Sequence, residues 1–88
     1  MNSIESTIRE FLLQLPGARK IRDLKPGDSL FRHGLLDSMG VIKTVAFCEE
    51  TFGIEIRDEE VIPENFESVR ALSRLIKRAQ SRVSPGSG

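Results

Sequence analysis

The stretch that decides the fold is residues 37–53, which read DSMGVIKTVAFCEETFG. Its first two residues, Asp37 and Ser38, are both good helix N-cap types, and Gly53 is the residue type that most often ends a helix. Apolar side chains recur between these ends at helical spacing, at Val41, Val45, Cys48 and Phe52. The pattern predicts an amphipathic helix that buries this face against the rest of the protein.

Two more helices are expected, one toward each end of the chain. Residues 4–15 carry apolar side chains at helical spacing, with Asn2 as the N-cap and Glu5 in the capping-box position. Ser68 is the expected N-cap of a last helix. In that helix the buried face is expected to hold Val69, Leu72, Leu75 and Ile76, and the solvated face Arg70, Arg74, Lys77 and Arg78.

The remaining segments lack a long periodic pattern. Residues 16–36 contain turn formers and scattered apolar residues, which indicates a long loop packed on the core, and such loops are more often functional than incidental. Residues 58–62 begin with acidic side chains and precede Pro63, so one or two helical turns ending at this proline are expected. The predicted fold class is all-α, a small four-helix bundle over residues 1–80 with three longer helices, a short third helix and a flexible tail at residues 81–88.

The composition excludes several functional classes. The chain has 13 Lys and Arg against 13 Asp and Glu, and its formal net charge of +0 removes the usual electrostatic contribution to nucleic-acid binding. No apolar run approaches the roughly 20 residues of a membrane span. The single cysteine, Cys48, can form neither an intramolecular disulfide nor a cysteine-based metal site, and it is expected to be an inert core residue. The N-terminus lacks a signal-peptide pattern, so we expect a cytoplasmic protein. We also expect a monomer that holds no metal, binds no nucleic acid and does not insert into a membrane.

Ser38 occupies a special electrostatic position. The first-turn N–H groups of a helix have no intrahelical partner, and the helix dipole places partial positive charge there. A phosphate esterified to Ser38 would be stabilised at this position. Serine is also among the commonest N-cap residues, so position alone favours simple capping over modification.

A second apolar strip lies on a different face of the same helix. It consists of Met39, Ile42 and Ala46 and starts beside Ser38. Such a strip either docks a partner or is covered by the preceding loop. The charged residues that border it, Lys43, Glu49 and Glu50, either give charge selectivity to docking or form an ordinary solvated face.

Four segments at matching spacing resemble one protein family. Residues 28–40, DSLFRHGLLDSMG, resemble the phosphopantetheine attachment region of acyl and peptidyl carrier proteins, whose core signature is Asp-Ser-Leu or Asp-Ser-Met. Residues 49–56 resemble the end of the family's second helix, residues 58–60 the acidic start of its third, and residues 63–69 the lead-in to its fourth. The resemblance covers residues 4–78 and implies the same helical bundle.

The resemblance implies a carrier rather than an enzyme. Ser38 would be esterified by 4′-phosphopantetheine, transferred from coenzyme A by a phosphopantetheinyl transferase, and Asp37 matches the acidic residue before the attachment serine. The arm would bear an acyl or aminoacyl group as a thioester, loaded by an acyl- or aminoacyl-activating ligase and used by a downstream synthase or transferase. The same resemblance places Met39, Ile42 and Ala46 on the partner-recognition face.

Two residues depart from the pattern of many fatty-acid carriers. Lys43 stands where an acidic residue is common, and Gly40 where a polar residue is usual. Residues 34–40, GLLDSMG, more closely resemble stand-alone specialised carriers, such as the D-alanyl carrier protein and discrete peptidyl or aminoacyl carriers. Fatty acyl, polyketide and aminoacyl cargoes all stay open, although four bulky side chains indicate a filled interior, namely Phe11, Phe47, Phe52 and Phe66.

Three alternatives belong to other functional classes. An unmodified helical adaptor would bind a partner through Met39, Ile42 and Ala46 and would survive replacement of Ser38. A hydrolase that uses Ser38 and His33 is disfavoured, because the chain is small and lacks a recognisable oxyanion motif. A DNA-binding helix pair fits the fold class but lacks the positive net charge.

Overall fold

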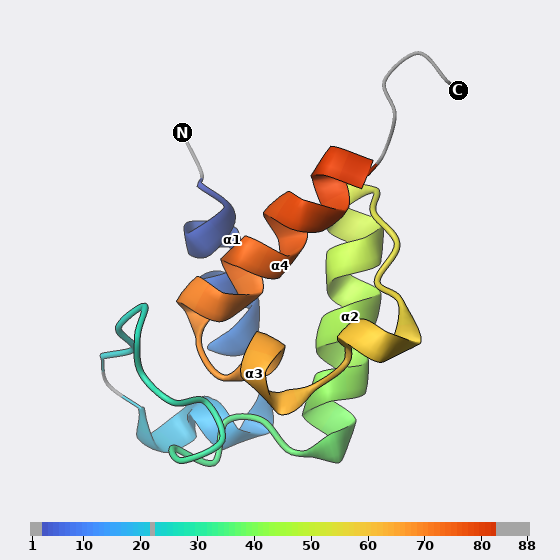
Figure 1. Cartoon of the computed structure of the whole chain (residues 1–88). Coiled ribbons are helices and arrows are strands. Elements are labelled where there is room, and N and C mark those ends of the chain that lie inside the picture. The colour runs from blue at the N-terminus through green and yellow to red at the C-terminus, as the bar shows by residue number, and fades with distance from the viewer. Residues whose placement is uncertain (1–2, 22, 83–88) are drawn as a thin grey trace.

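The described part of the chain contains six helical elements joined by loops. The computed structural model describes residues 3–21 and 23–82. Its elements are α1 (Ile4–Leu12), η1 (Pro16–Lys20), α2 (Ser38–Phe52), η2 (Asp58–Glu60), α3 (Pro63–Phe66) and α4 (Val69–Arg82), of which η1 and η2 are short 3₁₀ helices. Helix α4 packs against the other three α-helices and runs diagonally between α1 and α2 (Figure 1). The predicted all-α fold, with three longer α-helices and a short third one, is confirmed.

Helix α1 differs from its prediction at both ends. Its N-cap is Ser3, whose Oγ accepts a hydrogen bond of 3.0 Å from the Ser6 N–H, and the predicted cap Asn2 lies outside the described residues. The helix ends at Leu12 instead of residue 15. Proline disfavours helical backbone in the residue before it, and Leu15, which precedes Pro16, is extended at φ −71° and ψ 152°. Leu15 is nevertheless buried, so the helical spacing correctly marked a core position.

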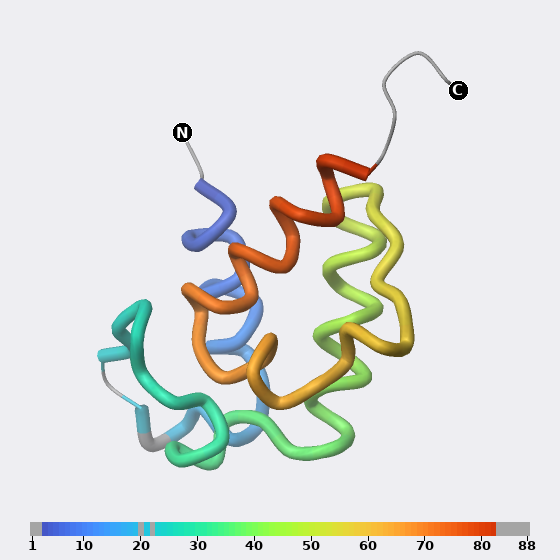
Figure 2. Tube along the Cα trace, viewed as in Figure 1, coloured from blue at the N-terminus to red at the C-terminus, as the bar shows by residue number. Residues whose placement is uncertain are grey.

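The segment predicted as a long loop before α2 begins with the 3₁₀ helix η1, and its residues 23–36 form a loop that crosses the end of the bundle where α2 begins (Figure 2). Three hydrogen bonds fasten it to the helices or their caps: Arg9 Nε to Leu24 O at 3.0 Å, Arg70 N to Pro26 O at 2.9 Å, and Leu30 N to Glu67 O at 2.7 Å. Gly17 lies so close to the Gly34 carbonyl that a side chain there would collide with the loop backbone. The predicted packed loop is thereby confirmed, and it fixes the direction in which the chain enters α2.

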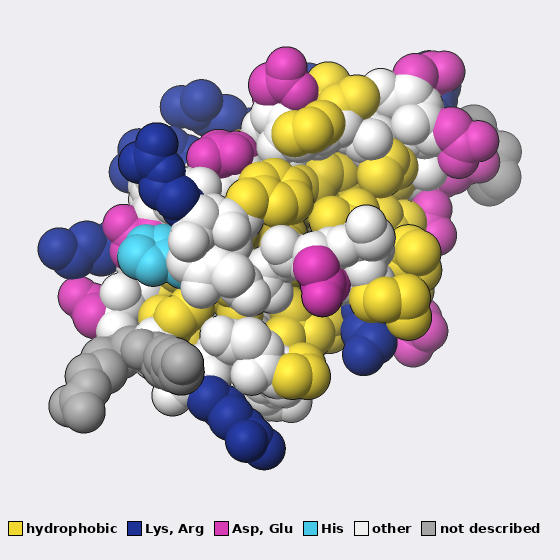
Figure 3. Space-filling view, turned by 90° about the horizontal axis from the view of Figure 1, so that it is seen from below, with side chains coloured by type: hydrophobic (Ala, Val, Ile, Leu, Met, Phe, Trp, Pro, Cys, Tyr) yellow, Lys and Arg dark blue, Asp and Glu magenta, His cyan; other side chains and the backbone are white. Residues whose placement is uncertain are grey.

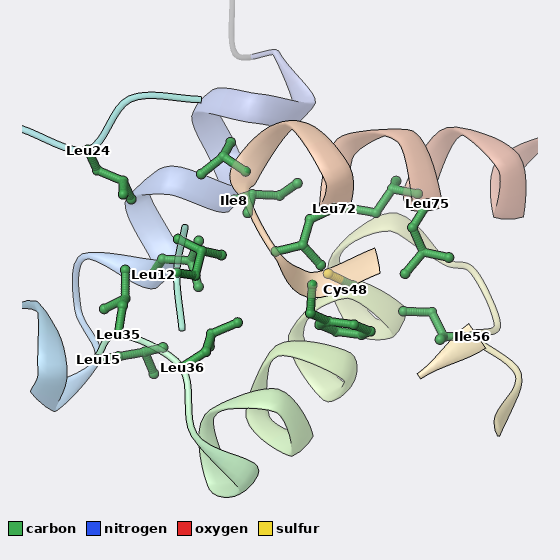
Figure 4. Close-up of a cluster of buried hydrophobic side chains, with 14 of the residues drawn as sticks. Ile8, Leu12, Leu15, Leu24, Leu35, Leu36, Cys48, Ile56, Leu72 and Leu75 are labelled. Carbon is green, nitrogen blue, oxygen red and sulfur yellow. The ribbon is translucent and has the colours of Figure 1, made fainter. Parts of the chain in front are cut away.

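Helix α4 provides the centre of the core. Its four predicted core residues, Val69, Leu72, Leu75 and Ile76, are at most 1% exposed, whereas Arg70, Arg74, Lys77 and Arg78 are exposed as predicted. Figure 4 shows Leu72 and Leu75 in one cluster with Ile8 of α1 and Cys48 of α2. The predicted cap is also confirmed, because Ser68 Oγ accepts from the Ala71 N–H at 3.1 Å.

Helix α2 buries a face that is shifted from the predicted one. Its buried residues are Gly40, Thr44 and Cys48. Of the predicted core residues, Cys48 is fully buried as expected, whereas Val41, Val45 and Phe52 are half-buried at the edge of the core. Thr44 is tolerated in the core because its hydroxyl donates a 2.7 Å hydrogen bond to the Gly40 carbonyl. The apolar pattern did not reveal this position, since a threonine counts as polar until its hydroxyl partner is known.

The phenylalanines fill the interior less completely than predicted. Phe66 is 1% exposed, whereas the other three are half-buried and line one side of the bundle. The rings of Phe11 and Phe47 stack at 4.1 Å between centroids, and Phe47 meets Phe52 edge-on at 6.4 Å. Most of this aromatic surface therefore joins α1 to α2 at the side of the bundle.

The segment between α2 and α4 also differs from its prediction. Instead of one short helix ended by Pro63, it forms η2 at Asp58–Glu60 and α3 at Pro63–Phe66. Proline fits the first position of a helix, because the N–H it lacks would have had no intrahelical partner there and its φ is already helical. Pro63 therefore begins the third α-helix.

The predicted boundary at residue 80 falls inside α4. Ser81 and Arg82 are helical, so these two residues do not belong to a tail, and residues 83–88 lie outside the described part of the chain. In the described ranges, no helix is both long enough and apolar enough to cross a membrane.

Candidate functional site

The start of α2 is built around an aspartate cap. Asp37 has extended backbone, and its Oδ1 accepts a 2.8 Å hydrogen bond from the Gly40 N–H. Ser38 is consequently the first residue of the helix, and its side chain is exposed. Within the described residues, the Ser38 hydroxyl takes part in no hydrogen bond. Of the two cap types that the sequence left open, Asp37 caps the helix, and the Ser38 hydroxyl stays available for chemistry.

The chain contains a second Asp-Ser pair, and its geometry is different. Ser29 is half-buried, and its Oγ accepts from the Arg32 N–H at 3.2 Å. Asp28 is similarly engaged, because its Oδ2 accepts from the Lys25 N–H at 2.9 Å and closes a turn of the loop. Both side chains of the Asp28-Ser29 pair thus stabilise the loop, whereas the Asp37-Ser38 pair combines a cap with an exposed hydroxyl.

An open groove of about 590 Å³ lies beside Ser38. One side is the start of α2, the opposite side is the segment from Val61 to Pro63, and the remaining lining includes Phe31 and Phe66. Figure 3 shows hydrophobic side chains gathered across this end of the molecule, with charged side chains mostly around the edge. The exposed hydroxyl of Ser38 therefore stands next to an apolar surface on which a flexible attached group can lie.

Most of the predicted partner face is exposed. Met39 is 60% exposed and Ile42 62% exposed, and Ala46, Lys43 and Glu50 are exposed as well. The alternative that the loop covers the apolar strip is therefore wrong. Exposed Val61 and Ile62, on the opposite side of the groove, extend this apolar surface.

Glu49 has a structural contact that the sequence did not reveal. It is half-buried, and its Oε2 accepts a 2.9 Å hydrogen bond from the backbone N–H of Ile56. This contact holds the extended residues after Gly53 against α2. One oxygen of this carboxylate is thus already engaged within the protein.

Two other residues, His33 and Cys48, have side chains of types that can be reactive. His33 is exposed on the loop. Cys48 is fully buried, and this burial raises the pKa of its thiol to about 12, with a smaller contribution from the nearby Glu49 charge. A thiol with such a pKa is protonated at neutral pH and a poor nucleophile. In the part of the chain that the structure describes, no three His, Cys, Asp or Glu side chains are grouped to hold a metal ion.

Several residues of the site were missed because they act through packing. Gly40 is buried, and a Cβ there would lie 3.1 Å from Leu36 Cδ2 and 3.3 Å from Asp37 Oδ1, closer than most van der Waals contacts. Its departure from the pattern of fatty-acid carriers is explained by this tight approach of the loop. Val61 and Ile62 were predicted only as part of a helix, since nothing local in the sequence shows that they face Ser38 across the groove.

Replacing Asp37 with alanine is expected to lower the free energy of unfolding by about 1 kcal/mol, because the Gly40 N–H loses its side-chain acceptor. For a domain of this size the midpoint of thermal unfolding should fall by about 4–8 °C, measured by circular dichroism. Asp37→Asn retains a capping oxygen and should lose much less. Equal stability of the alanine variant and the parent would contradict the assignment of the cap.

A helical bundle with an exposed serine after an aspartate cap, beside an apolar groove, defines the carrier class of small domains. A family profile described as "Phosphopantetheine attachment site" matches residues 6–76. The chain therefore belongs to the phosphopantetheine-binding family of acyl and peptidyl carrier proteins. Its cofactor is 4′-phosphopantetheine, and its general role is that of a carrier of this group.

A comparison with solved structures supports the same architecture. A solved chain described as "Crystal structure of FAD-dependent dehydrogenase" superposes with a TM-score of 0.65 at 31% sequence identity. The match covers 81% of this chain and 94% of that chain, so the two chains are of similar length. A search of curated proteins finds no match.

The residues around α2 fit the cofactor. A phosphate on an exposed hydroxyl at the first helical residue would stay in water while facing the positive end of the helix dipole. The pantetheine chain is long and mostly apolar or amide in character, and the adjoining groove offers it both apolar side chains and an open path to solvent. A buried or hydrogen-bonded serine such as Ser29 would offer neither.

Proposed function

We propose that this protein is a stand-alone carrier that bears acyl or aminoacyl groups as thioesters on a 4′-phosphopantetheine arm attached to Ser38. The observation that carries the proposal is that Asp37 and Ser38 have different roles at the start of α2. Asp37 caps the helix, so the exposed Ser38 hydroxyl is available beside the groove. The protein would catalyse no step itself and would present the cargo to partner enzymes in a biosynthetic pathway.

Attachment requires a separate transferase and coenzyme A. The Ser38 oxygen forms a new bond to the phosphorus of the pantetheine phosphate, the bond from this phosphorus to the nucleotide breaks, and 3′,5′-ADP leaves. The proton of the hydroxyl passes to a base of the transferase. The contribution of this chain is geometric, because the Asp37 cap and the packed loop hold the helix start in place while Ser38 projects into solvent.

The bound arm supplies a thiol that carries the cargo as a thioester. A tether of this kind raises the effective concentration of the cargo at a docked active site. An acyl- or aminoacyl-activating ligase would load the thiol, and a synthase or transferase would consume the thioester. The groove can shelter part of the arm or of an apolar cargo from water between these steps.

The direct test is modification of the unaltered chain. After incubation with coenzyme A and a broad-specificity phosphopantetheinyl transferase, intact-protein mass should increase by one phosphopantetheine group. Peptide mapping should place this group on Ser38 and leave Ser29 unmodified. No gain in mass by folded protein, with several transferases tried, would leave the unmodified adaptor as the better account.

We propose that partners dock on the exposed strip of α2. Met39, Ile42 and Ala46 supply its apolar centre, and Lys43, Glu49 and Glu50 supply its charges. The positive Lys43 lies nearer Ser38 than the two glutamates do along the helix. A complementary partner would therefore place acidic groups near its entrance for the arm and basic groups farther along the docked helix.

The variant Met39→Asp/Ile42→Asp is expected to weaken this docking. Charges in place of two exposed apolar contacts should reduce kcat/KM of a partner enzyme by about tenfold or more, because central apolar contacts contribute on the order of 1–2 kcal/mol each. The control is Arg74→Glu, an exposed charge change on α4. Equal losses in both variants, or none in the first, would remove this strip from the interface.

A flavin-dependent dehydrogenase is one partner class that we propose for this carrier. The support is that the similar solved chain is described as belonging to such an enzyme, together with the matching length of that chain. A thioester acidifies the carbon–hydrogen bond beside its carbonyl, which is the bond such chemistry breaks first.

Incubation of the loaded protein with purified dehydrogenases of this class and an electron acceptor, followed by mass measurement of the cargo, should show a loss of two hydrogens for one of them. Oxidation of the same cargo on free coenzyme A at equal rate would argue against a carrier-specific partner.

A further inference from the structure

The side of the groove that faces α2 is weakly held by apolar contacts. Ile56 and Phe66 are buried at the two ends of this segment, but Val61 and Ile62 between them are 38% and 42% exposed. Burial of apolar surface is the main source of local stability, so a segment with two exposed aliphatic side chains needs other attachments. We refer to residues 57–65 as the groove wall.

Polar contacts from the last turns of α4 provide these attachments. The Arg82 guanidinium donates to both carboxylate oxygens of Glu60, at 2.8 Å from Nη1 and 2.8 Å from Nη2. Its Nη2 also donates to the backbone carbonyl of Glu55 at 3.0 Å. One turn earlier, Arg78 Nη2 donates to Asn65 Oδ1 at 3.2 Å. Two arginines on one face of α4 thus bind the middle of the groove wall at Glu60, its end at Asn65 and the backbone just before it at Glu55.

The same contacts continue inside the wall. Asn65 Nδ2 donates to the Glu60 carbonyl at 2.8 Å, and the Arg57 N–H donates to Glu60 Oε1 at 3.0 Å. Hydrogen bonds from Arg82 and Arg57 hold the pKa of Glu60 below its usual value, so this carboxylate stays charged at neutral pH. One connected set of hydrogen bonds, of which those to the Glu60 carboxylate are charge-assisted, therefore holds the groove wall to α4.

We propose that Arg82 and Arg78 are positioning residues that hold the groove wall against the bundle and thereby set how readily the open groove beside Ser38 widens. The role in cargo handling rests on the proposed function, but the widening itself belongs to the unmodified chain. Exposed ion pairs add little to overall stability, so removal of this set should loosen the wall without unfolding the bundle.

Hydrogen–deuterium exchange of the unmodified chain tests the proposal. In Arg82→Gln, the amides of residues 57–65 should exchange several-fold faster than in the parent, with little change in the core of α1 and α4. Arg82→Lys retains the charge and should restore part of the protection, although lysine cannot make the paired contact. The control is Arg74→Gln, because Arg74 is exposed on α4 and has no hydrogen bond within the described residues.

A second readout follows the groove itself. A widened groove should bind the apolar dye ANS more strongly in Arg82→Gln and in Glu60→Gln than in Arg74→Gln, with an unchanged midpoint of thermal unfolding. Unchanged exchange of the wall, or faster exchange spread evenly over the whole chain, would overturn the positioning role. Both measurements use protein without the arm, so their outcome is separate from that of the modification of Ser38.

Discussion

Replacement of Ser38 with alanine is expected to abolish attachment of phosphopantetheine completely, while the fold and its stability stay close to those of the parent. The hydroxyl oxygen is the only atom of this side chain that can form the phosphodiester bond. Its loss should not unfold the helix, because Asp37 provides the cap and the Ser38 hydroxyl makes no hydrogen bond within the described residues.

Two measurements on the same samples check this expectation. Intact mass after incubation with coenzyme A and a transferase should show no gain for Ser38→Ala and one group for the parent. Thermal unfolding of the unmodified proteins should agree within about 0.5 kcal/mol, as is usual for exposed substitutions. The matched control is Ser29→Ala in the other Asp-Ser pair, which should be modified like the parent. Modification of Ser38→Ala would assign the arm to a different residue.

Replacement of Phe66 with alanine should have the largest effect on stability. Phe66 is 1% exposed, ends the short helix α3 and belongs to the central hydrophobic cluster. Phenylalanine-to-alanine changes in cores cost about 3–5 kcal/mol, which is a large part of the roughly 5–15 kcal/mol that stabilises a native protein. We expect the unmodified variant to be substantially unfolded near body temperature.

Urea denaturation followed by circular dichroism measures this loss. Phe66→Leu retains much of the apolar volume and should lose far less than the alanine variant. Val61→Ala is the control at the same groove, because Val61 is 38% exposed and should change stability by no more than about 0.5 kcal/mol. A Phe66→Ala variant with a parental midpoint would mean that this ring is not part of the central core.

The longer helices and the candidate serine were accessible from local patterns. The buried stripe of α4, the Ser68 cap and the Gly53 stop depend on neighbours three or four residues away, and all three were predicted correctly. Gly53 has a positive φ of 63°, which glycine adopts without steric cost. The aspartate and serine before α2 also marked the site, although their division into cap and exposed hydroxyl required the structure.

The errors arose where the local pattern allowed more than one outcome. Thr44 is buried because a helix carbonyl accepts its hydroxyl proton, and α1 ends early because the chain must turn before Pro16. Pro63 was predicted to stop a helix, but it begins one, since the same ring geometry suits both places.

Helical periodicity and helix-end residues were enough to predict a small all-α bundle, and the resemblance of residues 28–40 to a carrier family added the carrier class and Ser38 as the candidate attachment residue. Their signals are local, because helix formation and capping depend on side chains within about one turn. The groove beside Ser38, the exposure of Ile42 and the hydrogen bonds between Arg82 and Glu60 appeared only in the folded chain. These features join segments that are up to several tens of residues apart, and their contacts exist only after the core formed by α1, α2 and α4 has brought the segments together.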